Sequence, residues 1–338
     1  MDTDSNSCMI QRDVDLTEAN TLRLASTAAA KITIQSIDDL HTAFQFHRSE
    51  KIPLRPLGDG SNVILGNFIN ACILDIAIKG IEVVNEDHDN VWVKVGAGEN
   101  WHEWVSYALS NCWFGLENLA LIPGRVGASP IQNIGAYGVE VASYIDSVQF
   151  IDLDPSIDRL ESVKNYNNEQ CLFSYRNSIF KEKNNHRLIV SVTFRLAKSF
   201  TAQLSYPALC DAIDKLQLSC PNADDVFSSV VDLRNSKLPN PYEIPNAGSF
   251  FKNIEVDSST LNGLLAKCSS MPYFSLPSAD DKPLFKIPSA WLIEYCGYKG
   301  RREGCLAMHA KQALVLTNLS QVKDGEGPSA ADVLKFST

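Results

Sequence analysis

The sequence predicts an α+β protein, and three observations carry that prediction. Residues 31–35 and 91–95 alternate polar and apolar side chains, which is the two-residue period of a strand with one buried face. Residues 224–238 place apolar side chains three and four positions apart, which is the period of a helix. The 338 residues are 45% hydrophobic and 21% charged, an ordinary globular composition. At roughly 100–200 residues per domain, this length predicts two or three domains.

The other expected elements follow in chain order. A helix is expected from Ser36 to Phe46, because Asp38 and Asp39 would lie at its positively charged N-terminus. Further strands are expected at 53–57, 63–65, 72–75, 147–153, 188–194 and 313–317. Further helices are expected at 101–109, 207–218 and 290–296. Ser329 and Asp332 match a capping pattern, so a last helix is expected to begin there.

Charge, hydropathy and cysteine spacing exclude several classes of protein. The net charge is −10 and no dense basic run appears, so nucleic acid is not an expected partner. No apolar run approaches the ~20 residues that span a bilayer. The polar, acidic N-terminus is not a secretory signal, so we expect a cytoplasmic protein without membrane contact. The nine cysteines form no C-x-x-C pair and the six histidines no close pair, so neither disulfides nor a metal site is expected.

The first candidate binding segment is a short turn that follows an expected strand. It comprises Gly58, Asp59, Gly60, Ser61 and Asn62. Two glycines permit positive φ, so that successive N–H groups can form a nest for a pyrophosphate. The G-x-G-x-x-G dinucleotide fingerprint is not met, because Val63 stands where the third glycine would be. The residues alone leave two interpretations open, a tight turn between strands and a diphosphate-binding turn.

The second candidate is the segment 122–138, which is low in charge and rich in glycine. Its glycines would leave backbone groups open to a ligand, and its isoleucines would add apolar surface. This combination suits a flat aromatic cofactor with a diphosphate tail, and a buried irregular segment is the alternative. The candidate cofactor-binding residues are Ile122, Pro123, Gly124, Gly127, Ser129, Ile131, Ile134 and Gly138.

Two polar residues are candidates for chemistry. Arg176, next to Tyr175, offers a bidentate fork for a carboxylate or phosphate, although a lone arginine also occurs in surface ion pairs. Ser249 follows Gly248 and precedes two aromatic residues, and its hydroxyl could act as a proton donor or nucleophile. No G-x-S-x-G elbow and no nearby histidine accompany it, so a Ser-His-Asp hydrolase is not expected.

Taken in order, these motifs resemble the UDP-N-acetylenolpyruvoylglucosamine reductase (UDP-N-acetylmuramate dehydrogenase) family of bacterial peptidoglycan synthesis. The resemblance runs from about Leu16 to the C-terminus, and its motifs are specific in combination. They are Leu57–Ile64, Gly96–Trp101, Gly115–Gly124, Ser129–Glu140, Tyr175–Lys181, Lys237–Pro239, Asn246–Asn253 and Ala290–Ile293. The region around Tyr206 resembles the longer form of the family, which carries a tyrosine on a loop over the substrate.

The resemblance implies an oxidoreductase flavoprotein that uses FAD and NADPH. It implies an FAD-linked oxidase (PCMH-type) FAD-binding fold in two subdomains, at 14–80 and 81–235, followed by an α+β substrate-binding domain at 236–338. Residues 1–13 are expected to form a disordered tail. The implied reaction reduces UDP-N-acetylenolpyruvoylglucosamine to UDP-N-acetylmuramate, which serves cell-wall biogenesis and thereby cell shape, cell division and the cell cycle. The implied partner is this nucleotide-sugar substrate, bound by a monomer.

The resemblance also assigns roles to individual positions. The FAD diphosphate would meet the turn 58–62, and the isoalloxazine ring would meet the segment 122–138. Arg176 would neutralise the enolate-like charge that hydride addition creates, and Ser249 would donate the proton. The positions that would hold the substrate are Tyr175, Tyr206, Lys237, Asn253 and Tyr273.

The C-terminal pattern of the family has no match in this sequence. In the family, a long helix and an L-x-x-E-V segment follow the strand matched by 313–317, and that glutamate is the third catalytic residue. This sequence ends at Thr338 without it, so we expect the substrate domain to be shortened. The alternative function is accordingly a catalytically impaired flavin-binding remnant. A different FAD-linked oxidase, acting on an alcohol, is disfavoured by the Asn246–Asn253 motif and the Tyr206 region.

Overall fold

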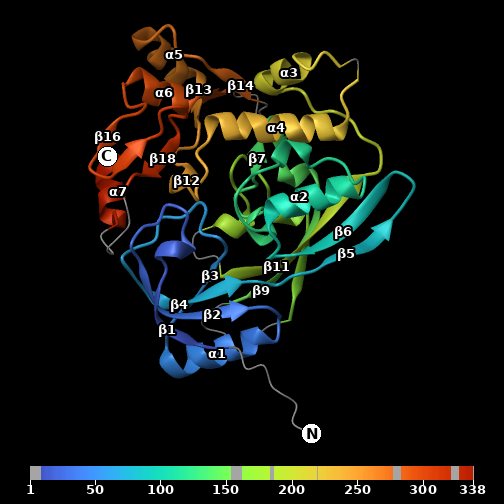
Figure 1. Cartoon of the computed structure of the whole chain (residues 1–338), viewed down its shortest axis with the longest axis vertical. Coiled ribbons are helices and arrows are strands. Elements are labelled where there is room, and N and C mark those ends of the chain that lie inside the picture. Colours follow the sequence, from blue (N-terminus) through green and yellow to red (C-terminus); the bar gives the residue numbers. More distant parts are fainter. Residues whose placement is uncertain are drawn as a thin grey trace. The chain divides into compact units, whose positions relative to one another are not determined.

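The chain divides into two compact units, each built around its own sheets (Figure 1). The structure is a computed structural model that describes residues 9–153, 162–182, 186–218, 220–276, 283–320 and 327–337. The N-terminal unit takes the described residues within Met1–Leu16, Ser26–Gly60 and Phe68–Ser236. The C-terminal unit takes those within Thr17–Ala25, Ser61–Asn67 and Lys237–Thr338. The division of the cofactor-binding part at residue 80 stays a prediction.

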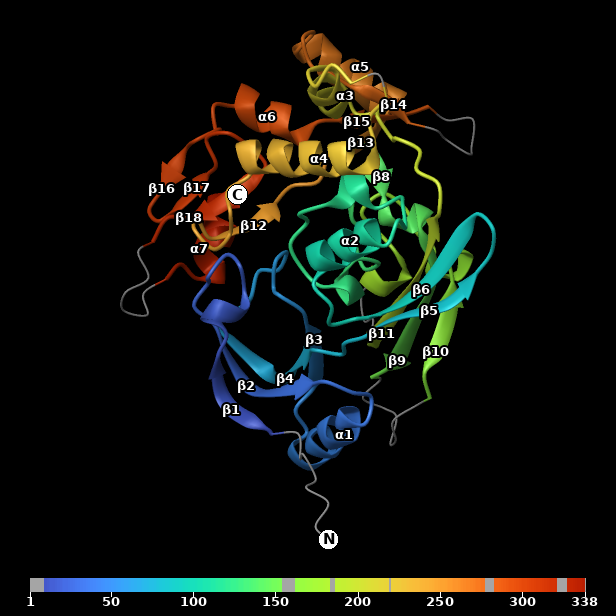
Figure 2. The ribbon, with the colours of Figure 1, turned by 45° about the vertical axis from the view of Figure 1, so that its right-hand side comes forward.

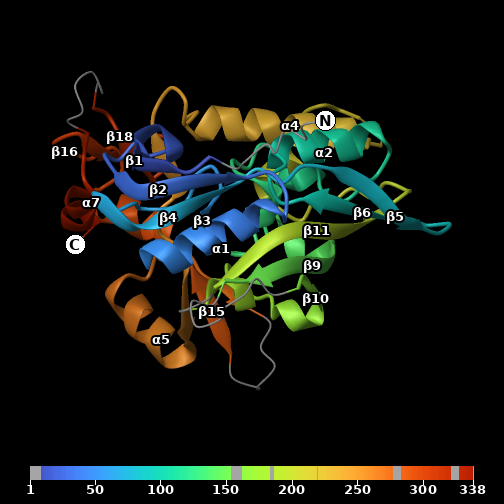
Figure 3. The same ribbon diagram turned by 90° about the horizontal axis from the view of Figure 1, so that it is seen from below.

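The first sheet of the N-terminal unit has the strand order β1-β2-β4-β3 among the described residues. Its strands are β1 (Gln11–Asp15), β2 (Thr27–Ile34), β3 (Leu54–Leu57) and β4 (Phe68–Ile76). Alternate residues of β2 are buried, as the period of its sequence predicts. The helix α1 (Asp39–Glu50) packs alongside β2 and β4 (Figure 3). Its residues Leu40, Ala43 and Phe44 are buried in the same apolar cluster as residues of these strands. The strand β3 pairs in parallel with β4, and the turn 58–62 directly follows β3 in the connection between these two strands.

The second sheet of this unit is antiparallel, with the order β10-β9-β11-β6-β5 within the described ranges (Figure 2). Its strands are β5 (Ile81–Glu86), β6 (Asn90–Gly96), β9 (Ile145–Asp152), β10 (Lys164–Asn167) and β11 (Arg187–Ala197). The helix α2 (Trp101–Ser110) begins where the side chain of Asn100 accepts a hydrogen bond from Glu103 N. Its residues Trp101, Trp104 and Val105 are buried in one apolar core that both sheets share.

The remaining strands and α-helices described in the unit follow the second half of the glycine-rich segment in the sequence or begin within it. They are the short pair β7 (Gly135–Ala136) and β8 (Val139–Glu140), the helix α3 (Pro207–Asp214) and the helix α4 (Ala223–Lys237), whose last residue belongs to the C-terminal unit. In Figure 1 the long helix α4 runs beside α2 and β7. Ring stacking of His102 on Phe227 joins α2 to α4.

The C-terminal unit contains two further sheets in its described part, in the orders β12-β18-β17-β16 and β13-β15-β14. Their strands are β12 (Asn246–Ser249), β13 (Ile254–Asp257), β14 (Phe274–Leu276), β15 (Leu284–Ile287), β16 (Arg302–Glu303), β17 (Leu306–Met308) and β18 (Val315–Asn318). The helices are α5 (Ser258–Lys267), α6 (Ser289–Tyr295) and α7 (Ala330–Ser337). Ser329 and Asp332 hydrogen bond reciprocally at the start of α7, which confirms the predicted capping pattern.

Three predictions of local structure are wrong. Residues 63–65 form no strand, because the chain first pairs with β2 and β3 from Phe68 onwards. The helix predicted from Ser36 begins at Asp39, whose carboxylate instead accepts hydrogen bonds from the N–H groups of Gln35 and Ser36. The predicted tail 1–13 includes residues 11–13, which belong to the strand β1 and pair with β2, and residues 1–8 lie outside the described residues.

One segment from the N-terminal part of the sequence joins the C-terminal unit, contrary to the predicted domain limits. The backbone carbonyl of Thr21 accepts a hydrogen bond from Asn246 N at 2.8 Å. The side chain of Asn318 donates to the carbonyl of Leu22 at 3.0 Å. Leu22 and Leu24 are also buried in the same apolar cluster as Leu316. These contacts join parts of the chain that are 225 to 296 residues apart, so local sequence could not place the segment.

Candidate functional site

The turn 58–62 is held from one side by an arginine. Arg125 Nε donates to Asp59 Oδ1 at 2.6 Å, and the two side chains are only 22% and 31% exposed. Gly60 has φ of +61°, so this position requires a residue that tolerates the left-handed conformation. Gly58, Asp59 and Gly60 belong to the N-terminal unit, whereas Ser61 and Asn62 belong to the C-terminal unit. The carboxylate of Asp59 is therefore engaged with the protein.

The segment 122–138 is anchored to the turn that precedes α2. Gly127 N donates to the carbonyl of Ala97, and Val126 N donates to the carbonyl of Glu99, both at 2.9 Å. A methyl group on Gly127 would lie 2.6 Å from the Cβ of Ala97, so only glycine fits this close approach. The segment therefore lies directly against the backbone of residues 97–99, in a path that its own sequence does not specify.

Backbone strain marks this segment and the residue before it, and the segment also holds an unsatisfied polar atom. Leu121, Asn133 and Tyr137 adopt φ of +57°, +43° and +48°, a conformation that costs a non-glycine residue about 1–2 kcal/mol. Such strain clusters at functional sites. The Ser129 hydroxyl is buried with no hydrogen-bond partner in the described chain. An unsatisfied buried hydroxyl costs about 1–3 kcal/mol, which a polar atom of a bound ligand would recover.

Arg176 lies on the glycine-rich segment. Its Nη2 donates to the carbonyl of Gly135 at 2.5 Å and its Nη1 donates to the carbonyl of Asn133 at 3.2 Å. Ser178, two residues after Arg176, donates from its Oγ to the carbonyl of Ile131 on the same glycine-rich segment, at 2.8 Å. Glu140 lies 3.8 Å from the guanidinium. The structure thus brings two separately predicted motifs into one constellation.

Asn133 holds this constellation together. Its side-chain amide donates to Glu140 at 2.8 Å and to the carbonyl of Ser174 at 3.1 Å. Its Oδ1 accepts from Ala142 N at 3.0 Å. Asn133 is buried, so these bonds satisfy its polar atoms. They also fix the loop whose carbonyl groups accept the hydrogen bonds of Arg176.

A second, partly buried network holds Leu121, the residue just before the segment. Leu121 N donates to His102 Nδ1 at 3.1 Å, and Arg234 Nε donates to the Leu121 carbonyl at 3.2 Å. Burial lowers the pKa of Arg234, and Tyr137 only partly opposes this. No carboxylate in the described ranges lies within ion-pair distance of Arg234. A partly buried cation without an anionic partner is costly, so Arg234 suits a ligand that carries negative charge.

His102 is expected to make stability depend on pH. Burial, and then the charge of Arg234, lower the pKa of His102 below its ordinary value. Below about pH 6.5 the unfolded chain therefore binds a proton that the folded chain does not, so stability falls as the pH falls through this window. Urea unfolding between about pH 7.5 and 5.5 should show a smaller loss of stability in His102→Asn than in the wild type.

The control for this measurement is His88→Asn, since His88 is fully exposed beside Asp89. This variant should lose stability with falling pH as steeply as the wild type. Equal pH dependence in all three proteins would show that His102 is not the group responsible.

Tyr206 lies beside the glycine-rich segment in the N-terminal unit. Its ring packs edge-on against Tyr137, with centroids 5.3 Å apart, and its side chain is 43% exposed. Asn118 donates to the carbonyls of both Tyr137 and Gln203, at 2.9 and 2.8 Å, which joins the Tyr206 region to the segment. Tyr175 is half-buried, with the Arg176 guanidinium over its ring. The function of the tyrosine loop stays a prediction.

The other predicted site residues belong to the C-terminal unit. Ser249 is exposed at the end of β12, after Gly248, which has φ of +67°. The turn before it is built by Asn246, whose Oδ1 accepts from Gly248 N at 3.0 Å. Asn253 Oδ1 accepts from Ser289 N at the start of α6, so this side chain caps a helix. Lys237 and Tyr273 are both exposed.

Sequence reasoning missed several residues that organise these segments. Arg125, Asn133 and Arg234 all stand within or next to predicted motifs, yet none was assigned a role. For Arg125, a charged residue inside a charge-poor stretch was a usable signal. For Asn133 and Arg234, no local signal distinguished their partners from solvent.

The described ranges contain no group of three or more His, Cys, Asp or Glu side chains positioned to hold a metal ion. Nor does any helix among the described residues have the length and apolar character needed to cross a membrane.

Two protein-family models match parts of this sequence. Residues 28–160 match the family model described as an FAD binding domain. Residues 240–336 match the model described as the C-terminal domain of UDP-N-acetylenolpyruvoylglucosamine reductase. The fold and these two matches thus define a flavin-binding oxidoreductase with a separate C-terminal domain, as predicted.

Relatives that match most of the chain identify the family within this class. The UDP-N-acetylenolpyruvoylglucosamine reductase of Pseudoalteromonas atlantica is 42% identical over 90% of this chain and 84% of its own. The reductase of Bdellovibrio bacteriovorus is 39% identical over 97% of this chain and 93% of its own. The chain belongs to the UDP-N-acetylenolpyruvoylglucosamine reductase family. A solved structure of the Thermus caldophilus reductase shares the fold, with a TM-score of 0.64 at 20% identity over 98% of this chain and 93% of that one.

Proposed function

We propose that this chain binds FAD and uses NADPH to reduce UDP-N-acetylenolpyruvoylglucosamine to UDP-N-acetylmuramate. The names of its relatives and the two family matches support the substrate and the flavin. The observation that carries the proposal is the position of Arg176, which is hydrogen bonded onto the glycine-rich segment proposed to meet the flavin. When bound, FAD would supply hydride transfer, first accepting a hydride from NADPH and then delivering one to the vinyl carbon remote from the substrate carboxylate.

The residues present fit such a cofactor. Backbone N–H groups of the turn 58–62 would hold the diphosphate, since the Asp59 carboxylate is already paired with Arg125. The apolar side chains of the segment 122–138 would cover the ring, and the unpartnered Ser129 hydroxyl is available to a polar atom of the cofactor. Arg234 supplies a partly buried positive charge that lacks a carboxylate partner in the described chain.

When the substrate is reduced, the protein itself would stabilise negative charge and donate a proton. Arg176 would stabilise the negative charge that develops on the substrate carboxylate, from a guanidinium already oriented by two backbone carbonyls. Ser249 would protonate the carbon next to the carboxylate. Lys237, Tyr175, Tyr206, Asn253 and Tyr273 would hold the nucleotide sugar. We place this reaction in cytoplasmic peptidoglycan precursor synthesis, carried out by a monomer.

The test uses the purified full chain. Its absorption spectrum should show bound flavin, and NADPH consumption should rise when the enolpyruvyl nucleotide sugar is added. Bound flavin without substrate-dependent NADPH consumption would instead select the impaired flavin-binding remnant. Flavin that is reduced by simple alcohols, but not by NADPH, would select an alcohol oxidase. A protein that takes up no flavin would overturn the proposal altogether.

A further inference from the structure

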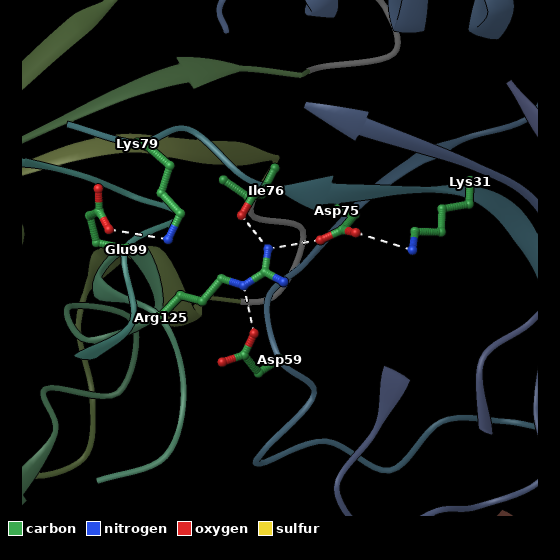
Figure 4. Close-up of polar contacts among 7 residues, drawn as sticks. All are labelled: Lys31, Asp59, Asp75, Ile76, Lys79, Glu99 and Arg125. Atoms are coloured by element: carbon green, nitrogen blue, oxygen red, sulfur yellow. Dashed lines mark hydrogen bonds and ion pairs between the residues drawn. The ribbon is translucent and has the colours of Figure 1, made fainter. Parts of the chain in front are cut away.

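Arg125 forms the centre of a cluster of four charged side chains in the N-terminal unit (Figure 4). Its Nε donates to Asp59 at 2.6 Å, and its Nη1 donates to Asp75 at 2.7 Å and to the carbonyl of Ile76. Lys31 lies 3.1 Å from the other oxygen of Asp75. All four side chains are less than a third exposed, so solvent screens their interactions only in part.

The cluster is electrically neutral, but its two carboxylates depend on Arg125 unequally. Asp75 is paired with both Arg125 and Lys31, so it keeps a cationic partner when Arg125 is removed. Asp59 has Arg125 as its one ion-pair partner in the described chain. Loss of Arg125 would therefore leave an unpaired, half-buried negative charge within the turn 58–62.

The stem of Arg125 reaches the same turn. Its Cβ, Cγ and Cδ atoms all lie 3.9 Å from the position that a Cβ on Gly58 would occupy. The backbone of Arg125 is fixed in turn, because it forms a β-bridge with Asn100 and precedes Val126, whose N–H donates to Glu99. A single side chain thus connects the glycine-rich segment 122–138 with the turn 58–62, which lies 66 residues away along the chain.

We propose that Arg125 is a positioning residue that turns Asp59 aside and neutralises it, so that the turn 58–62 can accept an anionic diphosphate. This inference rests on the proposed function, in which that diphosphate belongs to FAD. A free carboxylate among the N–H groups of an anion-binding turn would repel the ligand and compete for its donors. The pairing with Arg125 removes both effects.

The test measures the dissociation constants of FAD and of ADP for the flavin-free protein. Arg125→Ala should weaken the binding of both ligands on the order of tenfold or more, since one charge of a pair is left unpaired. Riboflavin, which has no phosphate, should bind as it does to the wild type. Asp59→Asn should bind FAD as tightly as the wild type or more tightly. The double variant Arg125→Ala/Asp59→Asn should recover most of the lost affinity, because the uncompensated carboxylate is gone.

Arg12→Ala is the matched control. Arg12 pairs with Glu50 at the same kind of distance, 2.7 Å, but the two side chains are 57% and 38% exposed, and they lie on β1 and α1. Its removal should leave FAD affinity unchanged.

Specific outcomes would overturn the inference. One is unaltered FAD affinity in Arg125→Ala. Another is a double variant that binds no better than Arg125→Ala, which a purely structural role predicts. If Arg125→Ala fails to fold, weaker FAD binding by Asp59→Asn overturns the inference on its own. Failure of the wild type to bind FAD would overturn the proposed function as well, whereas the other outcomes leave that function intact.

Discussion

Replacing Ser249 with alanine is expected to slow the oxidation of reduced flavin by the enolpyruvyl substrate on the order of 10²–10⁴-fold, the usual contribution of a general acid. Flavin content and flavin reduction by NADPH should match the wild type, because Ser249 belongs to the C-terminal unit and its side chain is exposed. Stopped-flow absorbance of the flavin, recorded separately for the two half-reactions, measures both rates.

The position of Ser249 makes this a clean experiment. The residue is exposed, and the turn that presents it is held by Asn246 through bonds that do not involve the Ser249 side chain. Ser259→Ala, which removes an exposed hydroxyl from α5, is the matched control and should leave both rates unchanged. Wild-type rates of oxidation in Ser249→Ala would exclude the serine as proton donor.

Replacing Arg176 with alanine is expected to lower the rate of the same half-reaction on the order of 10²–10³-fold, as the loss of a donor to a developing anion does. The guanidinium is held by the carbonyls of Asn133 and Gly135, so it would meet the transition state without first reorganising. Rapid mixing of the reduced enzyme with the nucleotide sugar measures the rate, and the flavin spectrum reports on the integrity of the segment 122–138.

Two companion variants separate charge from structure. Arg176→Lys keeps the positive charge without the planar fork, so it should recover only part of the rate. Arg195→Ala removes an arginine that lies over Trp92 in the same unit, and it should react as the wild type does. If Arg176→Ala retains the wild-type rate, Arg176 has no part in the reaction. A loss of bound flavin in that variant would instead assign it a structural role.

Local sequence was sufficient for elements whose causes lie within a few residues. The helix α2 has its cap at Asn100 and buries Trp101, Trp104 and Val105 on one face, and all of this is visible in ten residues. Residues 63–65 misled the prediction because an apolar run does not reveal whether a partner strand is available. Strand formation depends on hydrogen bonds from another part of the chain, and here β4 supplies them only from Phe68 onwards.

In the candidate site, too, some features were predictable from local sequence and others were not. The turn 58–62, the segment 122–138 and the Tyr175–Lys181 motif could each be recognised from their own residues, because glycines and an arginine fork have local signatures. That Arg176 lies on the carbonyls of Asn133 and Gly135 could not be recognised, since these residues are about forty positions away.

The family and the class of cofactor could be predicted from the sequence, because short motifs determine the local backbone conformation that binds a diphosphate or a flat ring. Only the tertiary structure decided which charged side chains form ion pairs. Arg125 pairs with Asp59 and Asp75, whereas Arg234 has no carboxylate partner in the described chain. The physical reason is that an ion pair depends on the distance between two side chains in space. That distance is fixed by packing of sheets and loops whose members are 50 to 66 residues apart.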